Sequence, residues 1–436
     1  MRSRWVIWIL ALFTVLFAAK TEAQGVIVHS QPLPARPSPQ PTPEQIAKMP
    51  VVALPIEEFK LLSAGTGWAS TGDRLFLTKD NGAHWKDISP PSSNQDHYAD
   101  VFFLDAATGW VLFSHPVQDG EHSESNASFS DWKLYLSFTV DGGSTWTAAS
   151  LPEWHGERGL SDQGVIAFAD KLHGWLSLGV DGNTVTAGSA LLLTSDGGRS
   201  WHDTPDAKEG PEGRIRGILA LTERDVWILG TPEGGPAMLW ATHDGGNSYQ
   251  QIALPALKEI APAEYPTYSL PTFTDGLHGY EAVSYSGGHG EKSTAVLYAT
   301  LDGGRTWKPD RTLSNLAEQE TVGSTVFCST WILPFASQGS QPTLVKVHPN
   351  DKTEAPTHKS SGDFNNCEIE FVTAGEGWMN CPGSLSATID GGNSWTTVAP
   401  RVRRGVLTSD AVTPLETLRI QTHTTNLPGT DRAAIP

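Results

Sequence analysis

The sequence is poor in cysteine and in long apolar runs. Its 436 residues include only three cysteines, at 328, 367 and 381, and no pairing of them has zinc-ligand spacing. The one extended apolar run, Trp5 to Ala19, is shorter than the roughly 20 residues of a membrane-spanning helix. We therefore expect no metal, no cofactor and no membrane span in the mature protein.

Positive charge is also scarce. The chain carries 30 Lys and Arg against 48 Asp and Glu, a formal net charge of −18. Such a surface repels phosphate backbones and anionic lipid, and favours cationic or neutral partners. We therefore exclude nucleic acid as a partner and interpret the acid excess, which is spread along the chain, as a solvated surface.

The N-terminus has the features of a secretory signal. Arg2 and Arg4 precede the apolar run, and Thr21-Glu22-Ala23 offers small residues before Gln24. We predict a signal peptide over 1–23 and a secreted or periplasmic protein, the alternative being an anchor formed by an uncleaved N-terminal segment. Residues 24–54 are proline-rich and predict a stiff, extended linker.

One short motif recurs along the rest of the chain. Its copies are TKDNGAHW from Thr78, TVDGGSTW from Thr139, TSDGGRSW from Thr194, THDGGNSY from Thr242, TLDGGRTW from Thr300 and TIDGGNSW from Thr388. A binding site is normally built once, whereas a turn that closes a repeated unit is built once per unit. The copies therefore indicate a structural repeat.

A second marker precedes each copy of the motif. It ends on an aromatic residue, at Trp68, Trp110, Trp175, Trp227, Tyr280 and Trp378. Successive marker aromatics are about 50 residues apart, except that the last interval is about twice as long. Trp331 divides this interval into two, so we count seven units, of which the one around Trp331 is degenerate because it lacks the Asp motif. Each unit has several short β-rich runs and no helical periodicity.

Units of this length predict a β-propeller. Four antiparallel strands per unit, closed into a ring, leave only short protected edges. Tandem immunoglobulin-like sandwiches would need about 100 residues per unit. We predict an all-β, seven-bladed propeller of four-stranded blades over 55–400, followed by a C-terminal extension over 401–436 that can contribute a closing strand.

The aspartate of the motif has a local role. Asp followed by Gly-Gly, or by Asn81-Gly82, suits a hairpin turn that needs positive φ, and the carboxylate can accept hydrogen bonds from the turn. A calcium loop would supply several carboxylates, whereas each motif supplies one. We therefore predict a structural role for the six aspartates, Asp80, Asp141, Asp196, Asp244, Asp302 and Asp390.

Two of the cysteines are placed for a disulfide. Cys367 and Cys381 lie symmetrically about Ala374, as opposite positions of a hairpin would, and an exported protein can oxidise such a pair. We predict this bond in the last blade, with Cys328 free.

The six motifs resemble the Asp-box, or bacterial neuraminidase repeat. Their pairing with the GW-type marker is most similar to exported propellers related to photosystem II assembly and stability factors. The resemblance implies a propeller with the Asp-box in the hairpin between the third and fourth strands. Because Asp-boxes occur in sialidases, xyloglucanases, sortilin-type receptors and non-catalytic scaffolds, it does not imply one function.

The sequence favours a scaffold over an enzyme. A sialidase of this superfamily would need an early RIP-type motif, which is absent, and the segment Arg214 to Arg216 lies in the middle of the chain without a proline. Nor does local spacing reveal the carboxylate pair of other glycosidases. We predict a non-catalytic interaction or assembly-factor propeller, the alternative being a sialidase-like glycoside hydrolase.

We expect the partner to bind on the face opposite the Asp-boxes. There the loops between second and third strands vary in length, and the blade connections carry polar and aromatic groups. The expected contacts are Asp96, His97, Tyr98, Trp154, His155, Glu157, Arg158, Arg214, Arg216, Tyr265 and Tyr268. A monomer that binds a protein or carbohydrate partner in the cell envelope is the expected form.

Overall fold

The computed structural model describes residues 48–403 with internal gaps. The gaps are 94–95, 117–131, 154–158, 181–187, 205–209, 212, 233–234, 236, 256, 258–264, 287–292, 317–324, 328–329, 338–339, 348–356, 359–366 and 382–383. Side chains are described except at 313–316, 325–327, 330–337, 340–347, 357–358, Tyr265, Ser286, Ser293 and Arg403. The predicted signal peptide, most of the linker and the extension beyond 403 therefore lie outside the described residues, as does Cys328.

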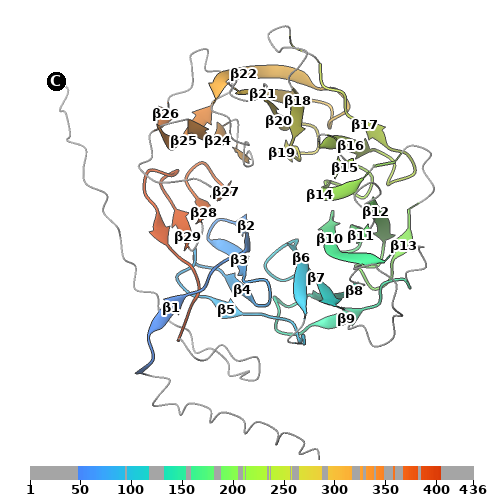
Figure 1. The fold of residues 1–436 in the computed structure, drawn as a ribbon, viewed down its shortest axis with the longest axis vertical. Helices are drawn as coiled ribbons and strands as arrows, with labels where there is room; N and C mark the ends of the chain where they lie inside the picture. The colour runs from blue at the N-terminus through green and yellow to red at the C-terminus, as the bar shows by residue number, and fades with distance from the viewer. Residues whose placement is uncertain are drawn as a thin grey trace, which may run out of the picture.

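The described chain is all β and forms a ring of antiparallel sheets (Figure 1). The first three four-stranded sheets are β2 (Glu58–Ser63), β3 (Thr66–Ser70), β4 (Leu75–Thr78) and β5 (Lys86–Asp87); β6 (His97–Phe103), β7 (Gly109–Pro116), β8 (Trp132–Thr139) and β9 (Thr147–Ala149); and β10 (Leu160–Phe168), β11 (Gly174–Val180), β12 (Gly188–Thr194) and β13 (His202–Asp203).

The other three sheets of this kind follow the same order. They are β14 (Arg214–Ala220), β15 (Val226–Thr231), β16 (Met238–Thr242) and β17 (Gln250–Gln251); β23 (Thr325–Phe327), β24 (Thr330–Ser337), β25 (Ser340–Val347) and β26 (Thr357–His358); and β27 (Glu368–Phe371), β28 (Gly377–Cys381), β29 (Ser384–Thr388) and β30 (Thr396–Thr397). The degenerate unit inferred around Trp331 is the sheet β23 to β26.

The prediction of seven four-stranded blades is wrong, because the described residues form six such blades. The remaining sheet has five strands, β18 (Tyr265–Tyr268), β19 (Thr272–Phe273), β20 (Gly279–Ser286), β21 (Ser293–Thr300) and β22 (Lys308–Leu316). Both β18 and β19 pair with β20, and the break between them contains Pro271, which has no N–H to donate to a ladder. At the break, the Ser269 N–H donates instead to Glu281 Oε1 at 3.1 Å.

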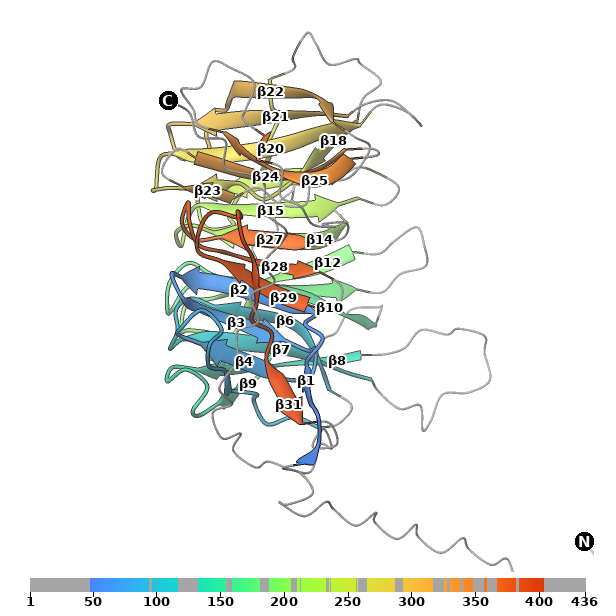
Figure 2. The same cartoon turned by 90° about the vertical axis from the view of Figure 1, so that its left-hand side faces the viewer.

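The two ends of the ring are formed by different connections between strands. The first strands, among them β2, β6, β10 and β14, lie nearest the centre (Figure 1). The Asp-box hairpins meet the hairpins between first and second strands, as where Gly303 N donates to Leu277 O at 2.9 Å. We call this the Asp-box end. The opposite side in Figure 2 is the loop end, where second strands lead to third strands and each blade leads to the next.

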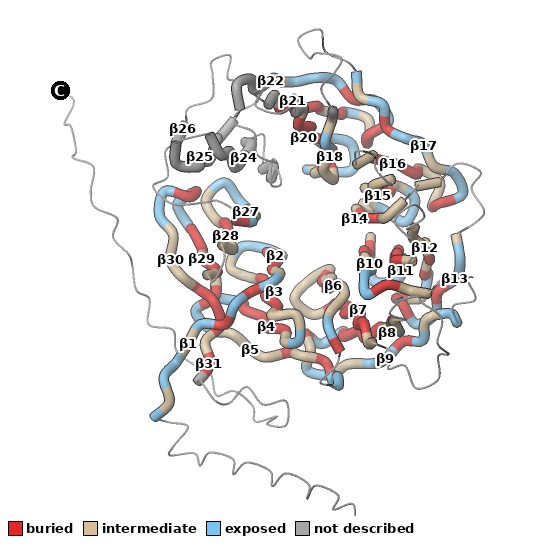
Figure 3. Tube along the Cα trace, viewed as in Figure 1, coloured by how far each residue is buried: buried red, intermediate tan, exposed pale blue. Residues whose placement is uncertain are grey.

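The core lies between neighbouring sheets, because clusters of buried apolar residues contain side chains from two adjacent sheets. Buried residues are red in Figure 3. All five marker tryptophans are completely or almost completely buried, namely Trp68, Trp110, Trp175, Trp227 and Trp378. Clusters of buried residues join one sheet to the next, as where Trp227 packs at a ring-centroid distance of 4.5 Å from Phe273. The marker aromatic is thus a wedge between blades, which suits its large apolar surface.

The ring is closed where the last blade meets the first. The Trp378 indole N–H donates to Asn81 Oδ1 at 2.7 Å, and the Trp85 indole N–H donates to Val398 O at 2.6 Å. A separate two-stranded sheet joins β1 (Val51–Ala53), in the segment predicted as linker, to β31 (Arg401–Arg403) (Figure 2). The sulfurs of Cys367 and Cys381 are bonded in the last blade, at 2.07 Å.

The same pattern of hydrogen bonds recurs within each of the six Asp-box hairpins. In the copy around Asp302, the Thr300 hydroxyl donates to Asp302 Oδ1 at 2.8 Å and accepts from Gly304 N at 2.9 Å. Oδ1 also accepts from Thr306 N at 2.9 Å, and the Thr306 hydroxyl donates to Oδ2 at 2.6 Å. These bonds to Thr306 hold the pKa of Asp302 at about 2. The carboxylate therefore stabilises the turn in which it lies.

Substituting Thr300 by valine is expected to lower the free energy of unfolding by about 1–3 kcal/mol. Thr300 is only 2% exposed, and the isosteric change leaves the buried Gly304 N–H without its acceptor. The comparison variant is Thr306→Val on the exposed side of the same turn. It removes the hydroxyl that donates to Asp302 Oδ2, but water can replace this donor, so a smaller loss of about 1 kcal/mol or less is expected. Urea denaturation of both variants measures the difference, and equal losses would contradict the assigned role of the buried hydroxyl.

Candidate functional site

Three neighbouring inner strands, β6, β10 and β14, are irregular near the loop end. Their registers with the second strands shift between Tyr98 and Asp100, between Leu160 and Gly164, and between Ile215 and Gly217. A β-bulge leaves a residue unpaired and re-aims its side chain, and bulges are over-represented beside functional sites. Because these bulges occur in adjacent strands and near the same end, they mark one location in the ring.

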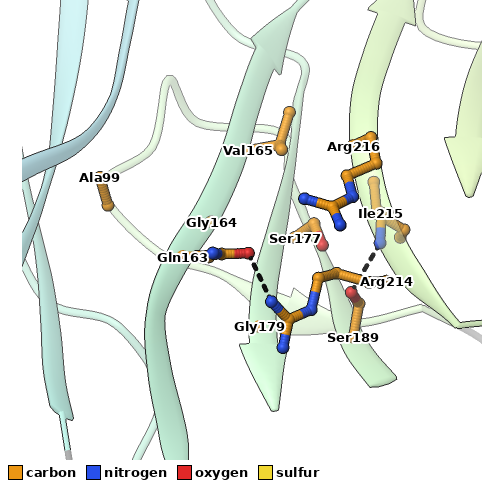
Figure 4. A pocket seen from close by; sticks show the side chains of 10 residues that line it. All are labelled: Ala99, Gln163, Gly164, Val165, Ser177, Gly179, Ser189, Arg214, Ile215 and Arg216. Carbon is orange, nitrogen blue, oxygen red and sulfur yellow. Dashed lines mark hydrogen bonds between the residues drawn. The ribbon is translucent and has the colours of Figure 1, made fainter. Parts of the chain in front are cut away.

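A cavity of about 190 Å³ opens at this location (Figure 4). Its lining includes one residue from each irregular stretch, Ala99 of β6, Gln163 of β10 and Arg216 of β14. The other lining residues are Gly164, Val165, Ser177, Gly179, Ser189, Arg214 and Ile215. We call this cavity the arginine pocket.

The arginine pocket belongs to the loop end. Gly179 is near the last residue of β11 and Ser189 near the first residue of β12, and these two positions pair with each other. The opposite ends of the same strands, at Gly174 and Thr194, lead to the Asp-box end. The pocket is therefore separated from the Asp-box hairpin by most of the length of β11 and β12.

Two guanidinium groups dominate the chemistry of the pocket. Arg214 Nη1 donates to Gln163 Oε1 at 2.9 Å, which orients Arg214, and Ser189 Oγ accepts from Ile215 N at 2.9 Å, which holds the bulged strand (Figure 4). Arg216 extends into the space between β10 and β14 and is exposed. Within the described ranges Arg216 has no hydrogen bond or ion pair, so its donors are available for an anion.

Acidic groups lie on the inner strands on the other side of β6. On β2, Glu58 and Lys60 alternate with buried Phe59 and Leu61. On β27, Glu368 and Glu370 alternate in the same way with buried apolar residues. Lys60 Nζ lies 2.5 Å from Glu370 Oε1, and Glu370 Oε2 accepts from Leu61 N at 2.9 Å. The inner surface is therefore acidic at β27 and β2 and basic at β14.

Two carboxyl groups of the inner strands, those of Asp100 and Glu58, have raised pKa values. Burial raises the pKa of Asp100, on β6, to about 6, even though its carboxylate accepts hydrogen bonds from Ile166 N and Val101 N. Burial, together with the charge of Asp100 nearby, raises the pKa of Glu58 well above its usual value. Perturbed carboxyl groups in a concave region are typical of functional sites.

The structure places the expected contact residues differently. Only Arg214 and Arg216 line the pocket. Asp96 is buried, accepts from Ser93 N, and accepts from His115 Nδ1 at 2.7 Å. Tyr98 packs edge-on against Phe113. These hydrogen bonds and ring contacts hold the connection before β6 and the first residues of that strand in place.

Of the other expected contacts, His97 is exposed and Tyr268 packs against the core between two sheets. Trp154, His155, Glu157 and Arg158 lie outside the described residues. Tyr265 begins β18, and its side chain lies outside the described part of the chain.

Sequence reasoning missed the polar residues of the inner strands. Gln163, Asp100 and Glu58 carry polar groups of the site, yet they lie in strands that were interpreted as scaffold. One available signal was the alternation of charged and apolar residues at the first strand of a unit, as in Glu58-Phe59-Lys60-Leu61.

Across the described ranges, no three His, Cys, Asp or Glu residues are grouped so as to hold a metal ion. No helix in the same ranges has both the length and the apolar character that crossing a bilayer requires.

Comparison with known proteins identifies solved structures only. No protein-family model matches the chain, and no curated protein matches its sequence. Membership of the Asp-box family therefore stays a prediction.

Solved structures that match include three different proteins. A structure described as YCF48 bound to D1 peptide has a TM-score of 0.41 at 17% identity, over 71% of this chain and 85% of that one. Trypanosoma rangeli sialidase in complex with sialic acid has a TM-score of 0.38 at 11% identity, over 69% and 57%. The tricorn protease has 0.47 at 9%, over 80% and 36%. With each of these TM-scores below 0.5, neither the fold nor the function of this chain rests on the similarity.

Proposed function

We propose that this protein is an exported interaction protein without chemistry of its own, which binds a protein partner through the loop end. The arginine pocket is the anchor point, and it receives an anionic group of the partner. The observation that carries this proposal is the coincidence of bulges in three adjacent inner strands with an available guanidinium group, that of Arg216.

The chemistry of the pocket favours an anionic group over a neutral one. A guanidinium presents donors in a planar fork that matches a carboxylate. Gln163 and the hydroxyl of Ser177 add hydrogen-bonding groups to the same lining. A neutral glycan would leave the charge of Arg216 without a counterpart, so an acidic side chain of a protein partner fits better.

The disulfide supports export. Such bonds persist in oxidising compartments and are rare in the cytosol. The bond between Cys367 and Cys381 therefore agrees with the secretory features of residues 1–23 and with a location outside the cytoplasm.

Replacing Arg216 by alanine is expected to weaken binding of an anionic peptide about tenfold or more. A lost charge-assisted hydrogen bond is worth about 1.5–3 kcal/mol. The probe is a blocked, fluorescently labelled peptide of six aspartates, and fluorescence anisotropy measures its dissociation constant. The matched control is Arg224→Ala, which removes the same charge from an exposed position at the Asp-box end. Equal weakening by both variants would show that only net charge matters and would contradict the pocket.

A further inference from the structure

Asp100 connects the arginine pocket to the acidic side of the ring. It follows Ala99, which lines the pocket. Its Oδ2 accepts from Ile166 N on β10 at 2.6 Å, and its Oδ1 accepts from Val101 N at 2.9 Å. Because Ile166 follows the lining residue Val165, this carboxyl group joins two walls of the pocket.

Four other inner strands, β2, β27, β10 and β14, carry charged groups beside the strand of Asp100. The negative charge of Asp100 contributes, after burial, to the raised pKa of Glu58 on β2. The full set is Glu58 and Lys60 on β2 with Glu57 just before it, Glu368 and Glu370 on β27, Asp162 on β10, and Arg214 and Arg216 on β14. Lys60 is already paired with Glu370, so Glu58 has no dedicated cation in this set.

Burial places the charge change of Asp100 in the mildly acidic range and shifts that of Glu58 upward from its ordinary range. The pKa of Asp100 is raised to about 6 by burial, and that of Glu58 is raised by burial and by the charge of Asp100. When the two groups are ionised, their negative charge opposes an anion in the pocket. When they are protonated they are neutral, and the field of the two arginines acts without that opposition.

We propose that proton uptake at Asp100 and Glu58 regulates the arginine pocket, so that an anionic partner group binds more tightly at mildly acidic pH than at neutral pH. This inference rests on the proposed function of the pocket. Asp100 acts here as a positioning residue, since it holds β6 against β10 through the Ile166 N–H rather than contacting the partner.

The proposal is tested with the same hexa-aspartate peptide at pH 7.5 and pH 5.5 in 0.15 M salt. The peptide keeps its charge over this range because the carboxyl groups of aspartate titrate near pH 4. At this salt concentration the Debye length is about 8 Å, so distant surface charges contribute little. The wild type is expected to bind roughly two- to tenfold more tightly at pH 5.5, as one or two charges near the site predict.

Two variants identify the titrating groups. Asp100→Asn and Glu58→Gln are each expected to bind at pH 7.5 more tightly than the wild type and to show a smaller pH dependence. If Asp100→Asn does not fold, as judged by circular dichroism, Glu58→Gln alone decides the question. The matched control is Asp162→Asn, which removes a negative charge from the irregular stretch of β10 and is expected to keep the pH dependence of the wild type.

The outcomes separate the regulation from the pocket itself. Peptide binding that needs Arg216 but shows the same pH dependence in wild type and Glu58→Gln would overturn the regulation and leave the pocket. A wild type without any pH dependence would do the same. Absence of peptide binding at both pH values would overturn the proposed pocket and the regulation together.

Discussion

Replacing Gly304 by alanine is expected to lower the free energy of unfolding by about 2–5 kcal/mol. Gly304 has a φ of +81°, a conformation that costs an L-residue roughly 1–2 kcal/mol. In addition, a Cβ at this position would lie 2.5 Å from Cζ2 of Trp227. Trp227 is fully buried, so its ring cannot move out into solvent, and overpacking of this kind costs about 1–3 kcal/mol.

The same protein provides a matched control for this change. Gly276 lies in the adjacent hairpin, and no atom of the described residues lies within 4 Å of an added Cβ. Its φ is outside the left-handed range. Gly276→Ala is therefore expected to change stability by no more than about 0.5 kcal/mol. Chemical denaturation of the two variants is the measurement. A loss at Gly304 no larger than that at Gly276 would show that this turn does not need its second glycine.

Replacing Glu281 by glutamine is expected to stabilise the protein at alkaline pH and not at acidic pH. Glu281 is fully buried, and its Oε1 accepts from Ser269 N at 3.1 Å. Its Oε2 has no hydrogen-bond partner within the described residues. The corresponding positions, directly after the marker tryptophans, hold Ala69, Val111, Leu176, Ile228 and Met379. A carboxyl group thus occupies a position that is otherwise apolar.

The direction of the pH effect follows from the raised pKa. Burial raises the pKa of Glu281 well above 4.5 in the folded protein. The folded state therefore holds a proton that the unfolded state releases once the pH exceeds about 4.5. The contribution of Glu281 to the free energy of unfolding is fully present below the pKa that this group has in the unfolded state. It is lost by about 1.4 kcal/mol per pH unit as the pH rises toward the pKa in the folded state.

Glutamine removes this dependence while it keeps an acceptor for the Ser269 N–H. Urea denaturation at pH 5 and pH 8 measures the difference between wild type and Glu281→Gln, and that difference is expected to grow with pH in favour of the variant. The exposed Asp203→Asn serves as the control, with a difference that stays constant. If the Glu281→Gln difference were also constant, the carboxyl group would titrate alike in both states.

The turn chemistry of this protein was predictable from sequence because it acts over a few residues. All the hydrogen bonds of Asp302 described above lie between residues 300 and 306, so the order of threonine, aspartate and glycine in the chain contains the whole network. The repeat length, the strand-rich units and the all-β propeller follow from the same local regularity. The sequence also identified the loop end as the side on which Arg214 and Arg216 lie.

Strand number and the composition of the site depended on residues far apart in the chain. Pro271 is visible in the sequence, but whether a strand resumes after it depends on β20, which pairs with the segments on both sides of the break. Likewise Asp100 and Ile166 are 66 residues apart, and the inner strands bring them together because the ring closes around one centre. Bulges depend on how a strand pairs with its neighbour. No local pattern therefore indicated that Arg216 lines the pocket whereas Tyr98 does not. The sequence by itself therefore determined the repeating unit, whereas the tertiary structure decided which side chains of different units share one pocket.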